Sequence, residues 1–304
     1  MSVNLPTHLV QQYSTNIELL LQQKGSKLRQ AVMTGSYVGK QASPVDQIGA
    51  ITAQQVTTRF GDMPRVDAST DRRWVFPTDY DLPQLIDSFD KLRMITDPSS
   101  SYVQNAVNAM GRAQDDVIIA ALFGTAKTGE SGGTSTTFGT TVTTSGGRNV
   151  AVATGAAAAT GLNVAKLREA KRKLMASEVD IDSDPIFCIV TAQQHDNLLS
   201  EIQITSSDFN DRPVLVDGKV TRFLGINFIH CERLQNGTDN ASGTSRAIPE
   251  FAKSGMHMGI WNDIQNTVTQ RNDLQGLPWQ VYTQMTIGAT RIEENKVVRV
   301  WCRE

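Results

Sequence analysis

The stretch between Thr96 and Gly124 predicts one long helix. Asp97 can serve as its N-cap, Pro98 occupies the first helical position, where a missing N–H costs nothing, and Gly124 stands where a C′ glycine is expected. Apolar residues recur at helical spacing at Tyr102, Val103, Ala106, Val107, Met110, Ala113, Val117 and Ala121. A rise of ~1.5 Å per residue gives a rod of about 40 Å, well above the usual globular length. Such a rod suits a structural building block better than an enzyme with a pocket.

Composition excludes several classes of protein. The 304 residues are enough for one large domain or two intimate ones. A formal net charge of -2 at pH 7 argues against a dedicated nucleic-acid binder, which normally carries a basic stripe. No apolar run approaches the ~18 residues of a membrane span, and the polar amino terminus lacks the apolar core of a signal peptide. We therefore expect a chain made and kept in a cytoplasm, without a membrane partner.

The three cysteines predict no disulfide framework and no zinc site. Cys188, Cys231 and Cys302 are too few and too scattered for either. Two of them lie in apolar runs, so buried thiols in a reducing compartment are expected.

Residues 1–45 are polar and rich in glutamine. Leu5 to Leu28 could form one amphipathic helix, but Gly25, Gly35 and Gly39 interrupt any longer element. The segment is interpreted either as an arm that a neighbour orders or as an ordinary docked terminus.

A charged β-hairpin is expected before the long helix. Residues 54–60 are rich in β formers, residues 61–64 carry turn chemistry, and residues 72–76 suggest a return strand. Because an isolated hairpin is marginal in water, this one is expected to lie on another subunit, the alternative being a solvated surface hairpin. The candidate inter-subunit contact residues are Arg59, Arg65, Asp67, Asp71, Arg72, Arg73 and Trp74.

Residues 124–161 consist almost entirely of Gly, Thr, Ser and Ala. Structureless loops of this length are rare in compact domains, so short surface β pairs or partial disorder are the two options. Residues 129–155 offer little apolar surface, and we expect them to be dispensable for folding.

A denser α/β pattern follows. Asn163 can cap a helix, residues 186–190 predict a buried strand, and Thr191 opens a short helix. Residues 219–224 and 226–231 predict two strands that bend at Gly225. Three further β runs are expected in the tail, at residues 267–271, 279–291 and 296–301, as a sheet that packs on the long helix.

No motif assembles an active site. Residues 124–131 have the spacing of a phosphate-binding loop, but Glu130 stands where the lysine must be. Asp180, Asp182 and Asp184 are spaced like the start of a calcium loop, but Pro185 occupies the glycine position, which favours a helix-to-strand turn. No nucleophile, base and orienter come together, so we expect no catalysis, no cofactor and no metal.

Several short strings, in order from Arg73 to Arg291, carry a family resemblance. They are Arg73-x-Val75-x-Pro77, Asp90-x-x-Arg93, Asp97-Pro98, Arg112-x-x-Asp115-Asp116 with Ala120 to Gly124, Pro185 to Leu199, Leu224 to Phe228, Gly259-x-Trp261-x-Asp263, Arg271-x-Asp273 and Gly288 to Arg291. Together they resemble the major capsid protein of tailed bacteriophages, which has the Hong Kong 97-type fold.

The resemblance implies an α+β chain of the Hong Kong 97-type capsid fold, with an N-terminal arm, an extended β-hairpin loop, a long spine helix with a peripheral β-sheet, and an inserted α/β axial domain. The implied divisions are an arm at 1–45, the extended loop at 46–82, a peripheral domain with spine helix and Gly/Thr-rich insertion at 83–161, the axial domain at 162–265, and the return sheet of the peripheral domain at 266–304.

The implied function is structural: self-assembly of hexamers and pentamers into an icosahedral head around double-stranded DNA, which is enclosed without sequence-specific binding. The implied partners are a separate scaffolding protein (unless the chain is already trimmed), a portal and a possible decoration protein, with assembly in the host bacterial cytoplasm. An encapsulin-type shell around an enzyme cargo is the alternative within this fold. A hydrolase or transferase with an unrecognised site is the alternative from another class.

Overall fold

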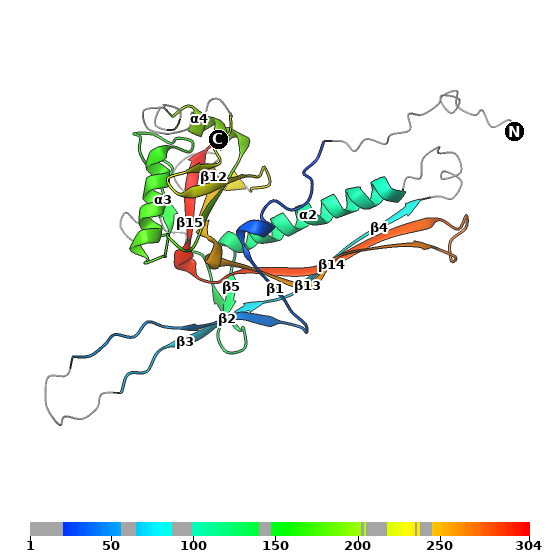
Figure 1. Cartoon of the computed structure of the whole chain (residues 1–304), viewed down its shortest axis with the longest axis horizontal. Helices are drawn as coiled ribbons and strands as arrows, with labels where there is room; N and C mark the ends of the chain where they lie inside the picture. Colours follow the sequence, from blue (N-terminus) through cyan, green and yellow to red (C-terminus); the bar gives the residue numbers. More distant parts are fainter. Residues whose placement is uncertain are drawn as a thin grey trace. The chain divides into compact units, whose positions relative to one another are not determined.

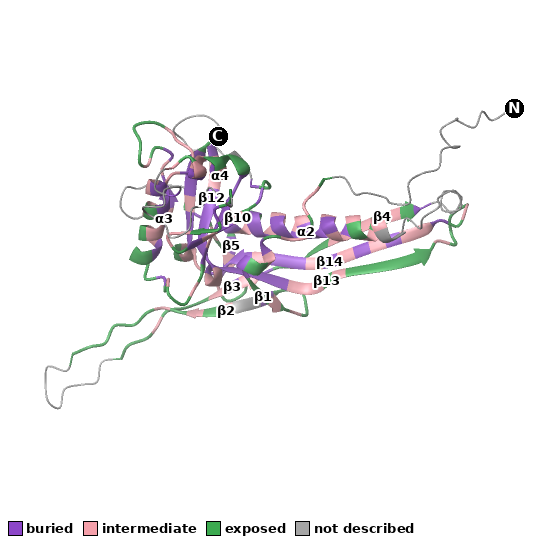
Figure 2. Cartoon of the chain, turned by 45° about the horizontal axis from the view of Figure 1, so that its top comes forward, coloured by how far each residue is buried: buried purple, intermediate pink, exposed green. Residues whose placement is uncertain are grey.

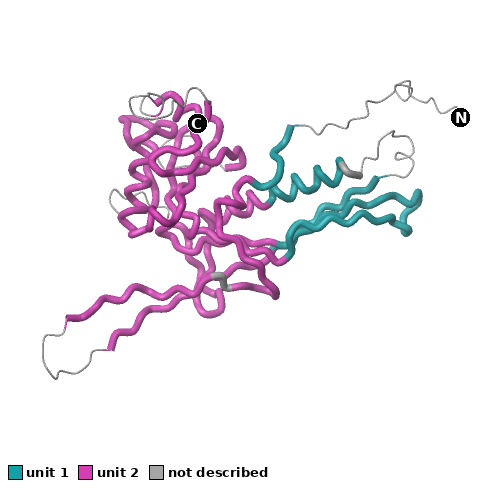
Figure 3. Tube along the Cα trace, in the orientation of Figure 1, with its two compact units in different colours: residues 1–26, 78–113, 262–286 teal, residues 27–77, 114–261, 287–304 magenta. Residues whose placement is uncertain are grey.

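The structure is a computed structural model that describes residues 21–55, 65–86, 99–139, 147–201, 204, 218–234, 236–237 and 245–304. The chain divides into two compact units (Figure 3). The first comprises Met1–Ser26, Thr78–Ala113 and Asn262–Thr286, and the second Lys27–Pro77, Gln114–Trp261 and Ile287–Glu304. Three elements contribute residues to both units, namely α2 (Ser99–Phe123), β13 (Met256–Gln270) and β14 (Trp279–Arg291), so each unit is described by itself.

Helix α2 runs over Ser99–Phe123, which confirms the long helix (Figure 1). The expected cap at Asp97 and Pro98 lies outside the described residues. At the other end, Gly124 does not have the left-handed backbone expected of a C′ glycine. A glycine is needed there because a Cβ would lie 2.6 Å from the carbonyl oxygen of Ala120.

The buried face of α2 is shifted from the predicted stripe. Ala106 and Met110 are buried as expected, whereas Tyr102 is 39% exposed. Towards the C-terminal end the fully buried side chains are those of Ile118 and Leu122, which the predicted stripe left out.

The first sheet has the order β1-β13-β14-β4. Its strands are β1 (Met33–Ser36), β13 (Met256–Gln270), β14 (Trp279–Arg291) and β4 (Thr78–Ile86). β1 runs parallel to β13. The expected tail strand at 279–291 is β14, and the one at 267–271 is the end of β13 except for Arg271, which follows the strand. β4 contains Pro83 and lies at the edge, where a missing backbone donor is tolerated.

The second sheet has the order β7-β15-β12-β8-β10-β9, with β11 also paired to β12. Its strands are β7 (Asn149–Val150), β15 (Val297–Arg303), β12 (Ser245–Ala252), β8 (Ile186–Val190), β10 (Ile226–His230), β9 (Arg222–Phe223) and β11 (Asn236–Gly237). β8 and β10 are parallel, and β12 is antiparallel to both of its neighbours β8 and β15. Most residues of β12 and β15 are buried, so these strands lie in the core of the second unit (Figure 2).

This sheet corrects one expectation about the tail. β15, the third tail run, pairs with β12 rather than with β14. The physical reason is burial: five of the seven residues of β15 are buried apolar residues or cysteine, namely Val297, Val298, Val300, Trp301 and Cys302. A strand of this kind is stable in the middle of a sheet, not at a half-solvated edge.

Helices α3 (Val164–Ala176) and α4 (Ala192–Leu199) begin at the predicted caps. The Asn163 side chain accepts a hydrogen bond from the backbone N–H of Lys166 at 2.8 Å, and the Thr191 hydroxyl accepts one from Gln194 at 3.4 Å. The predicted bend between β9 and β10 is also present, with a left-handed Gly225 (φ 82°).

The third sheet has the order β2-β3-β5-β6. Its strands are β2 (Ala42–Ile48), β3 (Thr70–Val75), β5 (Ala126–Thr128) and β6 (Thr134–Thr136). β3 agrees with the predicted return strand. Its partner is β2, upstream of the predicted strand at 54–60, most of which lies outside the described residues. The remaining elements of the described part of the chain are the 3-10 turns η2 (Arg29–Ala31), η3 (Lys253–Gly255) and η4 (Glu294–Lys296).

Part of the Gly/Thr-rich segment is ordered and buried, which argues against the expectation that residues 129–155 offer little apolar surface and are dispensable for folding. Residues 126–136 form β5 and β6, which resolves the two options for that part in favour of short β pairs. Phe138, Val150 and Val152 are each 3% exposed or less, so these residues of the segment contribute to the core of the second unit.

Within the described part of the chain, no helix is long and apolar enough to cross a membrane. All three cysteines are free thiols and buried, as expected.

Candidate assembly surfaces

The base of the hairpin is the antiparallel pair β2–β3. Asp46 lies opposite Arg72 and Ile48 opposite Thr70. The last backbone hydrogen bond of the pair runs from the Gly49 N–H to the Ser69 carbonyl at 2.6 Å. Beyond it, residues 50–55 and 65–68 belong to no strand.

Arg72 makes an exposed cross-strand ion pair. Its Nε and Nη2 donate to the two carboxylate oxygens of Asp46 at 2.6 and 3.2 Å. The side chains are 42% and 65% exposed, and the guanidinium also lies 5.7 Å from the Trp74 ring centroid. The hydrogen bond to Asp46 raises the pKa of Arg72. Arg72 is therefore at the surface, as the sequence suggested, but with a partner in its own chain.

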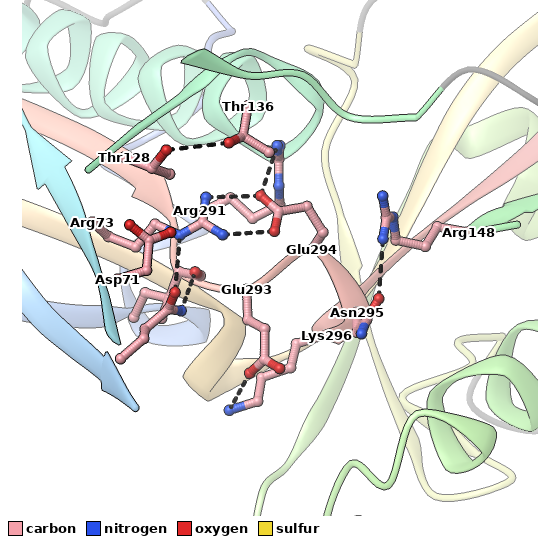
Figure 4. A network of polar contacts seen from close by, with 12 residues as sticks. Asp71, Arg73, Thr128, Thr136, Arg148, Arg291, Glu293, Glu294, Asn295 and Lys296 are labelled. Carbon is pink, nitrogen blue, oxygen red and sulfur yellow. Dashed lines mark hydrogen bonds and ion pairs between the residues drawn. The ribbon is translucent and has the colours of Figure 1, made fainter. Parts of the chain in front are cut away.

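Arg73 lies on the opposite face and is buried. Its Nη1 and Nη2 donate to the two carboxylate oxygens of Glu294 at 2.8 and 2.6 Å (Figure 4), and its Nε reaches Gln47 Oε1 at 3.4 Å. The side chains of Arg73 and Glu294 are only 6% and 13% exposed. Among the candidate contact residues, Arg73 thus anchors the hairpin base inside its own subunit.

Asp71 and Trp74 hold the segment between β5 and β6 against the hairpin base. The Trp74 Nε1–H donates to the Gly129 carbonyl at 2.7 Å, and the Gly129 N–H donates to Asp71 Oδ1 at 3.0 Å. A Cβ on Gly132, which has a left-handed backbone (φ 73°), would lie 3.1 Å from the Trp74 ring. The Gly/Thr-rich segment therefore braces the hairpin.

The limbs beyond this base present apolar and charged groups to solvent. Ile51 is 63% exposed and Val66 is 43% exposed. Arg65 and Asp67 form an ion pair at 3.0 Å with side chains 84% and 70% exposed. Arg59, the remaining candidate, lies outside the described residues.

A second surface is the segment of residues 22–28, here called the strap segment, which follows a polar stripe on α2. In the first unit, Gln22 Nε2 donates to Asn105 Oδ1 at 3.0 Å, and the Gly25 N–H donates to Asn108 Oδ1 at 3.2 Å. Arg112 Nη1 donates to Gln22 Oε1 at 2.6 Å. Spacings of three and four residues place these helix side chains on one face.

Close backbone contact fixes the crossing point of the strap segment. A Cβ on Gly111 would lie 2.4 Å from the carbonyl carbon of Gly25, so only glycine fits there. In the second unit, the fully buried Asp115 accepts hydrogen bonds from the backbone N–H groups of Lys27 and Leu28, both at 3.1 Å. The end of the described arm is thus ordered by its own chain.

A third surface is the outer part of β13. β1 covers only residues 257–260 of this strand, and at residues 262–270 the described sheet has β14 as the sole neighbour. Residues 265–270 are all exposed. A strand edge of this kind can pair with another chain.

Among the residues that the structure describes, buried titratable groups do not assemble into a reaction centre. Glu250, fully buried on β12, has no hydrogen-bond partner for either carboxylate oxygen. Burial raises its pKa well above the ordinary value, against a smaller lowering by Lys171, so the environment favours the neutral form of the carboxyl. In the described residues, no group of His, Cys, Asp and Glu side chains could hold a metal ion.

Exposed limbs, a long helix and an open strand edge are features suited to a structural subunit that contacts other chains. A family model described as "Phage capsid protein" matches residues 5–304. The chain therefore belongs to the phage capsid protein family. It is a structural component of the virion capsid and not an enzyme.

The solved structures that share this fold include phage capsids. The capsid of Cyanophage P-SCSP1u matches with a TM-score of 0.74 at 15% identity, covering 98% of this chain and 94% of that chain. The capsid asymmetric unit of Cyanophage Pam1 matches with 0.71 at 13% identity, covering 99% and 98%. Mycobacterium phage Che8 matches with 0.68 at 12% identity, again covering 99% and 98%. Among curated proteins no sequence matches. These results do not favour the encapsulin alternative.

Proposed function

We propose that this chain is the repeating subunit of the icosahedral head of a tailed double-stranded DNA phage, and that its hairpin limbs carry contacts between subunits. The observation that carries the proposal is the contrast along the hairpin. Its base is held inside the subunit by Arg73, Glu294 and Trp74, whereas Ile51 and Val66 stand in solvent. Exposed apolar side chains on an anchored extension gain stability when a neighbour covers them.

The domain map we propose keeps the arm at 1–45, the extended loop at 46–82, the peripheral parts at 83–161 and 266–304, and the axial domain at 162–265. α3, α4, β8 and β10 lie within the axial range, which supports it. Two strands cross these bounds: β4 begins within the extended loop and joins the first sheet, and β15 joins the sheet of β8 and β12.

Among the candidate contacts, Arg65, Asp67 and Arg72 are the described charged residues that we propose for the interface, because their ion pairs are exposed. Arg59 is proposed with them from sequence. Asp71 is exposed as well, but it accepts a hydrogen bond from the Gly129 N–H of its own chain. Asp71, Arg73 and Trp74 support the hairpin from within.

Further partners are proposed from the family alone: a separate scaffolding protein, a portal and a decoration protein, with assembly in the host bacterial cytoplasm. The chain has 31 acidic and 29 basic residues, and this near-neutral charge suits a shell that encloses DNA without binding it tightly.

The test replaces the exposed apolar groups of the limbs, using Ile51→Ser with Val66→Ser. The matched control is Met175→Ser, which removes a 58% exposed apolar side chain from α3. Covering the exposed part of one such side chain contributes about 1 kcal/mol, and a shell repeats the contact at every subunit. We expect the limb variant to fold, by circular dichroism, but to give few particles by electron microscopy, while the control assembles normally. Equal particle yields from both would contradict the proposal.

A further inference from the structure

Three guanidinium groups surround one aromatic ring where α2, β14 and β15 meet in the second unit. The distances from the Phe138 centroid to the Cζ atoms of Arg299, Arg291 and Arg148 are 4.7, 5.1 and 5.7 Å. Arg299 also lies 4.6 Å from the Phe123 centroid. We call Arg148, Arg291 and Arg299 the arginine cluster.

The cluster has too little negative charge around it. Glu294 binds Arg73 through both carboxylate oxygens and reaches Arg291 Nη2 only at 3.5 Å (Figure 4). Within the described residues, Arg148 and Arg299 have no ion pair with any carboxylate. Within the described residues, Glu294 is therefore the one carboxylate that pairs with any of these four guanidinium groups, and it pairs with Arg73 and Arg291 only.

Several donors of the cluster are also unused. The Nε atoms of Arg148, Arg291 and Arg299 are buried and have no hydrogen-bond partner. Arg291 is fully buried. Its Nη1 donates hydrogen bonds to the carbonyls of Ala121, Leu122 and Gly124 at the end of α2.

The two other arginines of the cluster, Arg148 and Arg299, have N–H groups without an acceptor among the described residues. Among the described residues, Arg148 makes one side-chain hydrogen bond, from Nη1 to Asn295 Oδ1 at 3.0 Å. The Arg299 guanidinium makes none with the described part of the chain. A buried guanidinium without an acceptor is costly, and the expected remedy is an acceptor with several oxygens.

The shortage of negative charge around the cluster accompanies lowered pKa values of two of its arginines, Arg299 and Arg291. Burial, with repulsion from Arg291, lowers the pKa of Arg299 to about 10. Burial also lowers the pKa of Arg291, with Arg73 and Arg148 acting in the same direction and Glu294 against it. Each of these shifts would be relieved by an added negative charge.

The adjoining sequence cannot supply that charge. Residues 140–146, which join Gly139 to Gly147, are Thr, Thr, Val, Thr, Thr, Ser and Gly and contain no acid. Because Arg299 is only partly exposed and flanked by rings, a small ligand suits the place better than a protein surface.

We propose that Arg148 and Arg299 bind a small oxyanion of the phosphate class, against the Phe138 ring and beside Arg291. The guanidinium fork matches an anion with two or more oxygens, and the aromatic faces keep the forks in place. The anion neutralises the cluster and so stabilises the junction of α2, β14 and β15.

The test compares the thermal midpoint of the purified full chain in potassium phosphate and in potassium chloride of equal ionic strength. Phosphate at about ten times its Kd is expected to raise the wild-type midpoint by about 3 °C. Arg299→Gln and, separately, Arg148→Gln should lose this shift. Arg72→Gln, which removes one positive charge away from the cluster, should keep it.

Titration calorimetry of the wild-type chain with inorganic phosphate gives a second readout that needs no variant, and one phosphate per chain is expected. Equal midpoints in phosphate and chloride would overturn the proposal. So would a phosphate shift that survives in both cluster variants, because the anion would then bind elsewhere. A purely aromatic role for Arg299 predicts that Arg299→Gln lowers both midpoints equally and leaves their difference intact, which would also overturn it.

Discussion

Arg72 and Arg73 are neighbours in sequence, yet replacing them should have very different consequences. Arg73→Gln removes one partner of a pair whose side chains are 6% and 13% exposed, whereas Arg72→Gln breaks a pair that is 42% and 65% exposed. Alternation along β3 places the two side chains on opposite faces. The sequence alone assigned both to the surface.

The stability expected to be lost in Arg73→Gln follows from the contacts that Glu294 keeps in the variant. Glu294 loses two hydrogen bonds of 2.8 and 2.6 Å and keeps only the 3.5 Å contact with Arg291. Breaking a buried pair from one side is strongly destabilising, and with the remaining contact we expect a loss of about 3 kcal/mol. That loss lowers the folding equilibrium constant by about a hundredfold. Arg72→Gln should leave the free energy of unfolding close to that of the wild-type chain, because solvent already screens the pair.

The assay is urea unfolding of unassembled subunits, followed by tryptophan fluorescence. The Arg73→Gln midpoint should fall clearly below that of Arg72→Gln. Adding Glu294→Gln to Arg73→Gln should lower stability by less than the sum of the two single changes, because the two residues form one interaction. Equal midpoints for Arg72→Gln and Arg73→Gln would refute the reasoning.

Three more predictions concern the strap segment and the core. Gly111→Ala should displace the strap segment and speed tryptic cleavage there, because the new Cβ would clash with Gly25. Gly133→Ala, where a Cβ meets nothing closer than 4.0 Å, is the control. Unchanged cleavage of Gly111→Ala would contradict the close contact between the strap segment and α2. Glu250→Gln should raise the urea midpoint near pH 8, and this gain over the wild-type chain should vanish below about pH 4.5. The reason is that a carboxyl whose pKa is raised in the folded state destabilises the wild-type chain as pH rises. A difference between variant and wild-type midpoints that does not change with pH would refute this prediction. Phe138→Ala should lower stability by about 3 kcal/mol, measured by thermal unfolding, and a wild-type midpoint would mean that the Gly/Thr-rich segment lies outside the core.

Elements with local signals could be predicted from the sequence. The caps at Asn163 and Thr191 lie where helices α3 and α4 begin, and β14 has the predicted bounds of 279–291. Asp180 also forms the expected turn, accepting hydrogen bonds from the backbone of Asp182 and Ser183. In each case the decisive contacts join residues close in sequence.

Contacts between distant residues could not be predicted. Arg73 and Glu294 are separated by 221 positions, and no periodicity links them. Nor does helical spacing of apolar residues reveal that Asn105, Asn108 and Arg112 form a polar stripe for the strap segment. The low hydrophobicity of the Gly/Thr-rich segment similarly hid the one phenylalanine, Phe138, that fixes it in the core.

The most direct test of the central claim, that this chain is a shell-forming capsid subunit, is electron microscopy of the purified full-length protein. It should be expressed alone and with the phage's other head proteins. We expect closed shells, tubes or capsomers in at least one of the two preparations. Only dispersed particles of the 33.2 kDa chain in both would contradict the account.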